Sequence, residues 1–163
     1  MTLEVVQWAE ATNAIRTAES ILLVTHISPD GDAIGSMLGL YHALSEMGKK
    51  VEVAVDDGVP DFLEFIPGWK EVSRRINGQW DVMVSLDASD EARTGEAGAF
   101  GRSHSATVIN LDHHATNTAF GHIHLVDPLA VSAAEMVYRW LKWMEHPVSL
   151  ESATALLTGM VTD

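Results

Sequence analysis

The fold of this chain is constrained most by short apolar runs that each end in an acidic or imidazole side chain. Three runs have this form, with the following residue in parentheses: residues 20–25 (His26), residues 81–86 (Asp87) and residues 107–111 (Asp112). Apolar runs of this length are typical of buried strands. An alternating run at residues 51–55 and a short run at residues 124–126 are also predicted to be strands.

Stretches with helical spacing of apolar residues separate these strands. The predicted helices span residues 3–19, 33–47, 133–144 and 150–160. Gly48 is placed to end the second helix, and Pro67-Gly68 marks a turn. Because strands alternate with helices, the sequence predicts an α/β fold with a mostly parallel sheet flanked by helices.

The residues that follow the apolar runs predict a functional site. In a parallel α/β sheet, ligands bind beyond the carboxyl ends of the strands. Three strands would deliver their acidic and imidazole groups to this edge: His26, Asp87 and the triplet Asp112-His113-His114. Unrelated surface turns would not all be expected at the carboxyl ends of apolar strands.

The composition of the 163 residues excludes several classes of protein. The absence of cysteine excludes a disulfide framework, a thiolate zinc site and a cysteine nucleophile. The net charge is −13, with 10 Lys and Arg against 23 Asp and Glu, so we expect no binding of long duplex nucleic acid. Because the chain shows no signal-peptide pattern and no run that would span a bilayer, we expect one cytoplasmic domain without membrane contact.

The segment His26-Ile27-Ser28-Pro29-Asp30-Gly31-Asp32 holds two carboxylates that are close but not adjacent. Gly31 lets the backbone bend between them, so one loop can offer an oxygen to each of two cations. A ligand set of carboxylates and imidazoles without sulfur favours Mn²⁺, with Mg²⁺ as the alternative, over a structural zinc. Two such ions about 3.5–4 Å apart would clamp a phosphate and activate a water as the nucleophile.

Each of these elements also has a simpler interpretation. Asp30-Gly31-Asp32 alone is equally consistent with an acidic turn that caps the following helix. Asp87 alone is more typical of a strand-end or loop carboxylate than of a ligand. The His113-His114 pair alone is ambiguous, because adjacent residues at a strand end point in opposite directions. The remaining histidines lie in no comparable acidic motif and are assigned no role: His42, His104, His122, His124 and His146.

Four ordered motifs make the chain resemble the N-terminal domain of the DHH phosphoesterase superfamily. They are residues 25–36 (THISPDGDAIGS), 85–87 (SLD), 108–117 (VINLDHHATN) and 157–163 (LTGMVTD). The nearest likeness is to the branch of bifunctional oligoribonucleases and 3′-phosphoadenosine-5′-phosphate phosphatases, often called nano-RNases. The resemblance runs through almost the whole chain and implies a Rossmann-like catalytic domain over residues 1–163.

The resemblance also implies roles for single residues. The metal ligands would be His26 and Asp30 for one ion, Asp32, His113 and Asp163 for the other, and Asp87 as the bridge between them. His114 would face the scissile phosphate, and Asp112 would orient a ligand by a hydrogen bond from behind. Gly35 and Ser36 would let the first-motif helix pack close to the site, and Asn117 would support the third-motif loop.

The implied function is a Mn²⁺-dependent two-metal phosphoesterase that hydrolyses short oligonucleotides or 3′-phosphoadenosine-5′-phosphate. The alternatives are a cyclic-dinucleotide phosphodiesterase, exopolyphosphatase or pyrophosphatase of a related branch, or a catalytically weak metal- or nucleotide-binding fragment. Family members normally continue into a linker and a second, DHH-associated domain, so we expect a truncated catalytic domain in which the terminal Asp163 frays and binds metal weakly. The sequence does not determine the oligomeric state, and a homodimer is left open.

Overall fold

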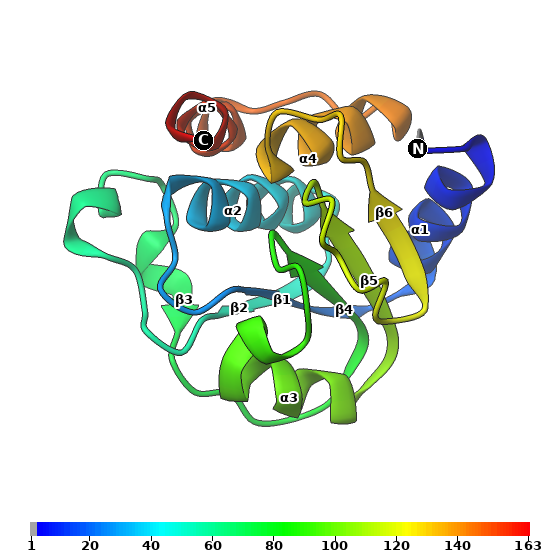
Figure 1. Ribbon diagram of the computed structural model, residues 1–163, viewed down its shortest axis with the longest axis horizontal. Helices are drawn as coiled ribbons and strands as arrows, with labels where there is room; N and C mark the ends of the chain where they lie inside the picture. The colour runs from blue at the N-terminus through cyan, green and yellow to red at the C-terminus, as the bar shows by residue number, and fades with distance from the viewer. Residues whose placement is uncertain (1–2) are drawn as a thin grey trace.

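The computed structural model describes residues 3–163, which form one six-stranded sheet with helices on both faces (Figure 1). The strands are β1 (Ser20–Thr25), β2 (Lys50–Ala54), β3 (Val72–Ser73), β4 (Trp80–Leu86), β5 (Ser105–Asp112) and β6 (Ile123–Val126). They lie in the order β3-β2-β1-β4-β5-β6, and every neighbouring pair is parallel. The chain direction across the sheet reverses between β1 and β4, so their carboxyl ends flank a topological switch point.

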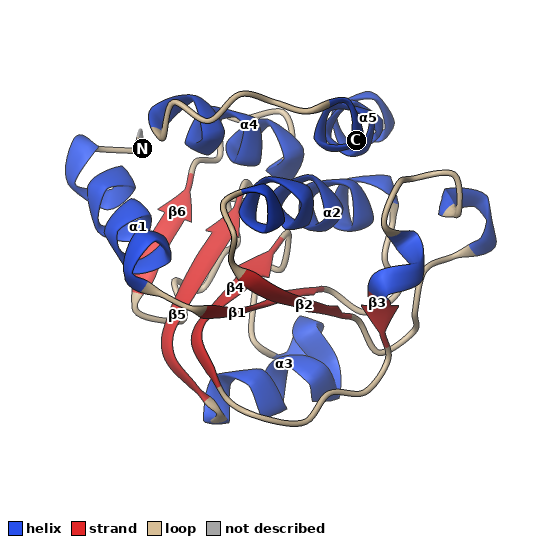
Figure 2. Ribbon diagram, turned by 180° about the vertical axis from the view of Figure 1, so that it is seen from behind, coloured by secondary structure: helices blue, strands red, loops and turns tan. Residues whose placement is uncertain are grey.

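Five α-helices surround the sheet: α1 (Val5–Thr17), α2 (Gly31–Glu46), α3 (Gly95–Ser103), α4 (Ala133–Trp143) and α5 (Leu150–Thr162). Helices α2 and α4 cover one face of the sheet, and α3 covers the other (Figure 1, Figure 2). Helix α1 packs beside β6, and α5 lies on α2 and α4 rather than on the sheet. Three short 3₁₀ turns complete the elements: η1 (Asp61–Leu63), η2 (Trp69–Glu71) and η3 (Ala92–Thr94).

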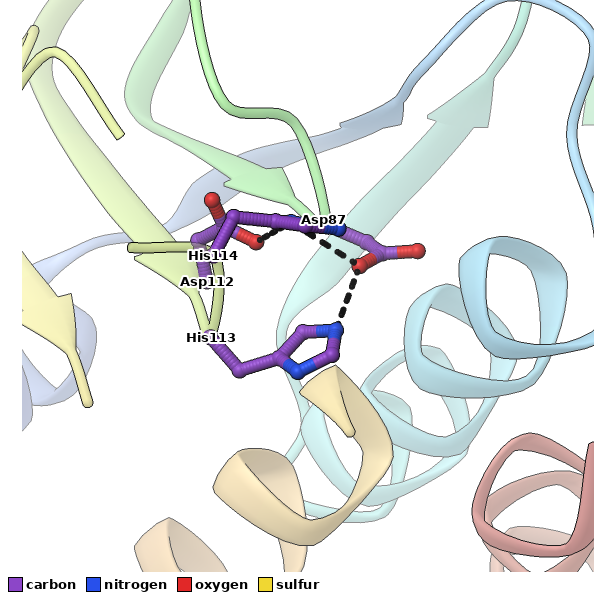
Figure 3. Close-up of side chains that lie close together, drawn as sticks. All are labelled: Asp87, Asp112, His113 and His114. Carbon is purple, nitrogen blue, oxygen red and sulfur yellow. Dashed lines mark hydrogen bonds and ion pairs between the residues drawn. The ribbon is translucent and has the colours of Figure 1, made fainter. Parts of the chain in front are cut away.

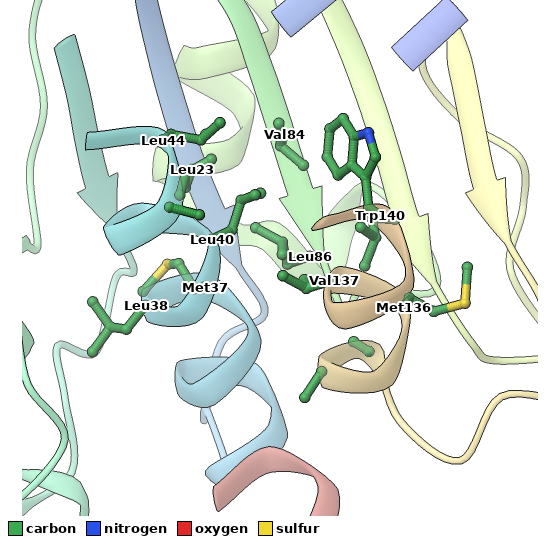
Figure 4. Close-up of a cluster of buried hydrophobic side chains, with 14 of the residues drawn as sticks. Leu23, Met37, Leu38, Leu40, Leu44, Val84, Leu86, Met136, Val137 and Trp140 are labelled. Atoms are coloured by element: carbon green, nitrogen blue, oxygen red, sulfur yellow. The ribbon is translucent and has the colours of Figure 1, made fainter. Parts of the chain in front are cut away.

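The central strands are held by apolar side chains on both faces of the sheet. In β1, Leu23 packs in the larger cluster beneath α2 and α4, whereas Leu22 and Val24 pack in a smaller cluster beneath α3. Figure 4 shows side chains of α2 and α4 that meet those of β1 and β4 in the larger cluster. Trp140 of α4 is fully buried there, and its indole N–H donates to the hydroxyl of Thr12 at 3.0 Å. This double-sided packing gives the strand ends fixed positions.

A row of glycines on α2 lets α5 approach the helix backbone. A Cβ atom on Gly35 would lie 2.5 Å from the carbonyl oxygen of Ala155 and 2.9 Å from the nitrogen of Gly159. One turn away on either side, Gly31 and Gly39 face side chains of α5 in the same way. Gly35 therefore allows the close helix packing that was expected of it, and this packing carries the end of α5 toward the carboxyl edge of the sheet.

The predicted α/β class and parallel sheet are confirmed, and every predicted helix and strand is present. The strand at residues 20–25 has the predicted bounds, and the ends of the other elements differ by at most two residues. Helix α3 was not predicted because Gly95, Gly98 and Gly101 give its segment a low helix propensity. The short strand β3 and the 3₁₀ turns also lacked a recognisable pattern. Across residues 3–163, none of the helices combines the length and apolar character needed to cross a membrane.

Candidate metal centre

The first predicted ligands lie in the loop between β1 and α2. His26 directly follows β1 and is 6% exposed. Its Nδ1 lies 2.6 Å from the carbonyl oxygen of Ile27, so a neutral imidazole that donates this hydrogen bond presents the lone pair of Nε2. This Nε2 lies 3.7 Å from Oδ1 of Asp30. Asp30 is also the N-cap of α2 and accepts the N–H of Ala33 at 2.9 Å, so the capping interpretation is confirmed for this side chain.

Asp32 lies in the first turn of α2, and its carboxylate is buried. Its two oxygens accept the backbone N–H groups of Ala133 and Ala134, at 2.8 and 2.9 Å. These donors belong to the first turn of α4, whose N-terminal end favours a negative charge. Helix α4 therefore fixes the orientation of a carboxylate that α2 carries.

Asp87 directly follows β4 and is the central carboxylate of the site. Its φ angle of 63° lies in the left-handed region, where a residue other than glycine is strained, and its N–H donates to the carbonyl of Leu111 at 3.0 Å. One carboxylate oxygen, Oδ2, lies 3.5 Å from Nε2 of His26. The other, Oδ1, lies 3.4 Å from Nε2 of His113. The side chain thus faces two different imidazoles with its two oxygens.

The triplet at the end of β5 presents both imidazoles toward Asp87 (Figure 3). The His113-His114 pair is ambiguous from the sequence alone, and the structure places the two ring centroids 4.5 Å apart. Strand alternation does not extend to them because β5 ends at Asp112. The Nδ1 atom of His114 lies 2.7 Å from Oδ1 of the buried Asp112. The other oxygen of Asp112 accepts a hydrogen bond from Asn117 at 2.8 Å, so the expected support of this loop by Asn117 is present.

The last predicted ligand, Asp163, follows α5. Its Oδ2 lies 3.5 Å from Nε2 of His113, and its side chain is 26% exposed. The close packing of α5 on α2 brings it there, because α5 packs mainly on α2 and α4. The structure therefore brings all eight predicted site residues to one edge of the sheet. The expected fraying of Asp163 stays a prediction.

The donor atoms leave gaps of the size of a cation. Nε2 of His113 lies 3.6 Å from Oδ2 of Asp32 and 3.4 Å from Oδ1 of Asp87. Donor atoms bound to one ion at about 2.1 Å lie about 3.0–3.4 Å apart in octahedral or tetrahedral geometry, whereas direct hydrogen bonds are shorter. Within the described part of the chain, the buried Nε2 of His113 and Oδ1 of Asp87 have no hydrogen-bond partner. The residues present therefore fit a divalent cation.

The donor atoms form three overlapping groups: His26, Asp30 and Asp87; Asp32, His113 and Asp163; and Asp87, Asp112, His113 and His114. Asp87 belongs to the first group, and its Oδ1 lies 3.4 Å from Nε2 of His113 in the second. Within each group the donor atoms lie within 4.8 Å of one another. This arrangement can hold two ions with one carboxylate between them, which is the geometry of a two-metal phosphoryl-transfer site.

The two imidazoles carry raised pKa values when no cation is bound. Burial alone would lower the pKa of His26, but the nearby carboxylates of Asp30 and Asp87 outweigh it and raise the pKa to about 10. The carboxylate of Asp87 beside Nε2 raises the pKa of His113 to about 9, against the opposing effect of burial. Metal ligation requires the unprotonated Nε2, so a cation must displace a proton from each ring.

The pKa values of the carboxylates are shifted in different directions by their neighbours. The neighbouring imidazole of His26 lowers the pKa of Asp30 to about 2. Burial raises the pKa of Asp32 to about 8, and the negative charges of Asp87 and Asp163 act in the same direction. Burial and Asp87 also raise the pKa of Asp163, although His113 opposes them. Positive charge is therefore favoured most strongly between Asp32, Asp87 and Asp163.

Sequence reasoning missed two residues that line the cleft above the site. The cleft has a volume of about 270 Å³ and is lined by His26, Asp30, Asp87, Ser89, Arg93, His114 and Asp163. Ser89 and Arg93 lie in the connection between β4 and α3, where no apolar run marks a motif. The only sequence signal is a single cation, Arg93, shortly after the strand-end Asp87 in an acidic stretch.

The histidines that were assigned no role make hydrogen bonds away from the cleft. Nε2 of His42 lies 2.6 Å from the carbonyl oxygen of Pro67, and Nε2 of His146 lies 2.9 Å from the carboxylate of Glu46. The remaining three contact backbone atoms near their own strands and helices: His104, His122 and His124. These contacts account for them as structural side chains.

A parallel α/β domain that gathers carboxylates and imidazoles beyond its strand ends is of the class whose members bind cations and phosphates at that edge. Within this class, the chain belongs to the DHH family of phosphoesterases. The family description that matches is "DHH family, N-terminal domain", and the match covers residues 20–160.

Relatives and solved structures agree with this family. The chain is 40% identical over 145 residues to the bifunctional oligoribonuclease and PAP phosphatase NrnA of Thermus thermophilus, covering 88% of this chain and 43% of that protein. It is 30% identical to NrnA of Mycoplasma pneumoniae, covering 95% of this chain and 49% of that protein. The chain thus spans about half the length of the curated relatives it matches.

Among solved structures, an exopolyphosphatase-related protein from Bacteroides fragilis superposes with a TM-score of 0.91 at 33% identity. The superposition covers 99% of this chain and 52% of that one. Exonuclease RecJ bound to manganese superposes with a TM-score of 0.54 at 17% identity, covering 99% of this chain and 43% of that chain, which is a likeness of fold alone.

Proposed function

We propose that this chain is the catalytic domain of a two-metal phosphoesterase that hydrolyses short oligonucleotides or 3′-phosphoadenosine-5′-phosphate. The observation that carries the proposal is the placement of Asp87, whose two oxygens face two separate groups of donor atoms at 3.5 and 3.4 Å. A carboxylate in this position is suited to bridge two cations and to fix the spacing between them.

The proposed ligands are those expected from the sequence. His26 and Asp30 would hold one ion, Asp32, His113 and Asp163 would hold the other, and Asp87 would serve both. The mixture of carboxylate oxygen and imidazole nitrogen suits Mn²⁺, with Mg²⁺ as the alternative. When bound, the two cations would polarise a phosphate and lower the pKa of a water that serves as the nucleophile.

The protein's own contribution to the reaction centres on His114. The carboxylate of Asp112, 2.7 Å away, accepts a hydrogen bond from the Nδ1–H of His114 and so leaves Nε2 free to face the substrate. His114 is the more exposed of the two imidazoles in the triplet, with 43% of its side chain accessible, and it lines the cleft. A protonated Nε2 here would stabilise the charge of the scissile phosphate or protonate the leaving oxygen.

The substrate class follows from charge and from the relatives. A chain with a net charge of −13 is unsuited to long nucleic acid, whereas a cleft of about 270 Å³ is suited to a small phosphate ester. The NrnA relatives are named for oligoribonuclease and PAP phosphatase activities. The Bacteroides fragilis structure is named as exopolyphosphatase-related, so polyphosphate is the second candidate substrate. The expected cytoplasmic location stays a prediction.

The test is hydrolysis of a ribodinucleotide, 3′-phosphoadenosine-5′-phosphate and polyphosphate by the same preparation, with Mn²⁺ and with chelator. We expect Mn²⁺-dependent release of mononucleotide or phosphate from the first two substrates. Asp87→Asn is expected to abolish turnover and the binding of both ions, because the bridging carboxylate serves each. Asp61→Asn, an exposed acid of η1, is the matched control. Equal metal-independent turnover in Asp87→Asn would refute the two-metal proposal.

A further inference from the structure

Arg93 brings a positive charge to a cleft that is otherwise lined by acids and imidazoles. It lies in η3, on the connection that follows Asp87, and shares the wall of the cleft with Asp30 and Asp163. Its guanidinium reaches the metal centre directly, since one terminal nitrogen lies 3.3 Å from Nδ1 of His26.

That nearest neighbour offers the guanidinium no acceptor. Nδ1 of His26 carries a proton that it donates to the carbonyl of Ile27, so both partners of the 3.3 Å contact are donors. Within residues 3–163, no carboxylate lies within ion-pair distance of Arg93, although acids outnumber bases in the chain. Arg102 and Arg139, in contrast, each pair with an acid. Arg93 therefore keeps its donors available to a molecule in the cleft.

The backbone of Arg93 is held in place on both sides. Its carbonyl accepts the N–H of Ile27 at 2.7 Å, and its own N–H donates to Oδ1 of Asp90 at 3.0 Å. The following helix α3 is anchored by the carboxylate of Asp56, which accepts the N–H groups of Glu96 and Ala97 at 2.7 and 2.9 Å. A fixed backbone reduces the freedom that the side chain loses when it binds a ligand.

We propose that Arg93 forms a phosphate-binding subsite beside the His26 and Asp30 end of the metal centre. The ligand is a phosphoryl group of the nucleotide substrate, so this inference rests on the proposed function. The planar guanidinium presents parallel N–H donors that match two oxygens of a phosphate, and it stays charged at every physiological pH. In a cleft lined by Asp30, Asp87 and Asp163, it also offsets the repulsion that an anionic substrate meets from these acids.

The test measures binding separately from turnover. Adenosine 5′-monophosphate and adenosine are titrated calorimetrically into the Mn²⁺-loaded protein and its variants. We expect Arg93→Gln to raise the Kd for the monophosphate about 10- to 100-fold, the range for loss of hydrogen bonds from a charged group, and to leave the Kd for adenosine unchanged. Arg93→Lys keeps the positive charge but loses the planar pair of N–H donors. Its Kd for the monophosphate is expected to lie between those of the unaltered protein and Arg93→Gln.

Two controls separate this role from a structural one. Arg75→Gln removes an exposed arginine that is remote from the cleft, and no change in either Kd is expected. Mn²⁺ binding, followed by the loss of the free-ion EPR signal, is expected to be unaltered in Arg93→Gln. An unchanged Kd for the monophosphate, or an equal loss for adenosine, would overturn the subsite. So would an equal loss of Mn²⁺ affinity, because Arg93 would then act through His26.

The outcomes also distinguish the subsite from the proposed function. If the unaltered protein hydrolyses no phosphoester but binds the monophosphate in a manner that depends on Arg93, the proposed function fails and the subsite stands. If the unaltered protein hydrolyses the dinucleotide and Arg93→Gln has the same KM and the same Kd, the subsite fails and the function stands.

Discussion

Replacing Gly35 with alanine is expected to separate α5 from α2 and so to disturb one half of the metal centre. The added Cβ would lie 2.5 Å from the carbonyl oxygen of Ala155 and 2.9 Å from the nitrogen of Gly159. Ordinary contacts between such atoms are about 3.5 Å or longer, so the helices must move apart by about 1 Å. The obstructing atoms are backbone atoms, which cannot rotate out of the way.

Two opposing contributions set the expected change in stability. Alanine in a helix interior is favoured over glycine by up to ~1 kcal/mol. Overpacking of a close interface costs about 1–3 kcal/mol, and contact with rigid backbone belongs at the upper end of that range. The net expectation for Gly35→Ala is therefore a loss of about 2 kcal/mol in the free energy of unfolding.

The displacement of α5 also has a consequence for metal binding. Asp163 follows α5, so it moves with the helix, and a ligand displaced by about 1 Å falls outside the tolerance of about 0.2 Å for a metal–ligand bond. We expect weaker binding of the ion at Asp32, His113 and Asp163. The ion at His26, Asp30 and Asp87 is expected to keep its affinity because α5 carries none of these ligands. Urea unfolding and a two-site Mn²⁺ titration measure the two effects.

Gly39→Ala is the matched control, one turn further along the same helix. The atoms that its Cβ would meet belong to the side chain of Leu156, which can change rotamer. We expect it to be less destabilising than Gly35→Ala and to bind both ions as the unaltered protein does. Equal stability of the two variants, together with two intact Mn²⁺ sites in Gly35→Ala, would refute the argument that this glycine places Asp163.

Two further predictions concern the imidazoles. In the metal-free protein, the pKa values of His26 and His113 are raised from 6.5 to about 10 and about 9, so the folded state holds more protons than the unfolded state in this window. The stability that they contribute is complete below pH 6.5 and is lost as the pH rises through 9 and 10, whereas Mn²⁺ affinity increases over the same range. Urea unfolding with chelator at pH 7 and pH 9.5 and Mn²⁺ titrations at both pH values check this, and Mn²⁺ affinity that does not change with pH would contradict it. Asp112→Asn leaves His114 without the carboxylate that fixes its tautomer, so kcat is expected to fall about 10- to 100-fold with Mn²⁺ binding unchanged. An unchanged kcat in that variant would remove the orienting role of Asp112.

The fold was predictable where sequence pattern and tertiary environment agree. The buried strands β1, β4 and β5 are apolar on both faces, and their ends are marked by His26, Asp87 and Asp112. Strand ends in a parallel sheet meet by topology, so the convergence of these groups needed no knowledge of side-chain contacts. In α3 the sequence pattern and the tertiary environment disagree, because its glycines by themselves disfavour a helix. Gly101 instead serves packing, since a Cβ there would lie 2.6 Å from a methyl carbon of Leu22.

The part of the site that sequence reasoning missed depends on contacts without a local signature. Arg93 reaches the cleft because Ile27 and Asp90 bind its backbone and Asp56 anchors the following helix. Asp90 lies in the same loop as Arg93, but Ile27 and Asp56 come from two other loops, and no spacing in the sequence connects those two residues to Arg93. The sequence also left open whether Asp30 caps the helix or binds a cation. One carboxylate has enough lone pairs for both roles, so the sequence could not decide between them.

The cluster of acids explains why fold and cation binding are linked in this domain. Asp32 and Asp87 are buried, and burial together with mutual repulsion raises the pKa of Asp32 to about 8. The hydrogen bonds that Asp32 accepts from α4 favour its charged form, whereas the neighbouring carboxylates disfavour it. A bound cation would remove this conflict by offsetting the negative charges. A cation that binds only the folded state at 100 times its Kd adds about 2.7 kcal/mol to stability. The helices that place Asp32 and Asp163 are therefore held in part by the ion that these residues bind in the proposed function.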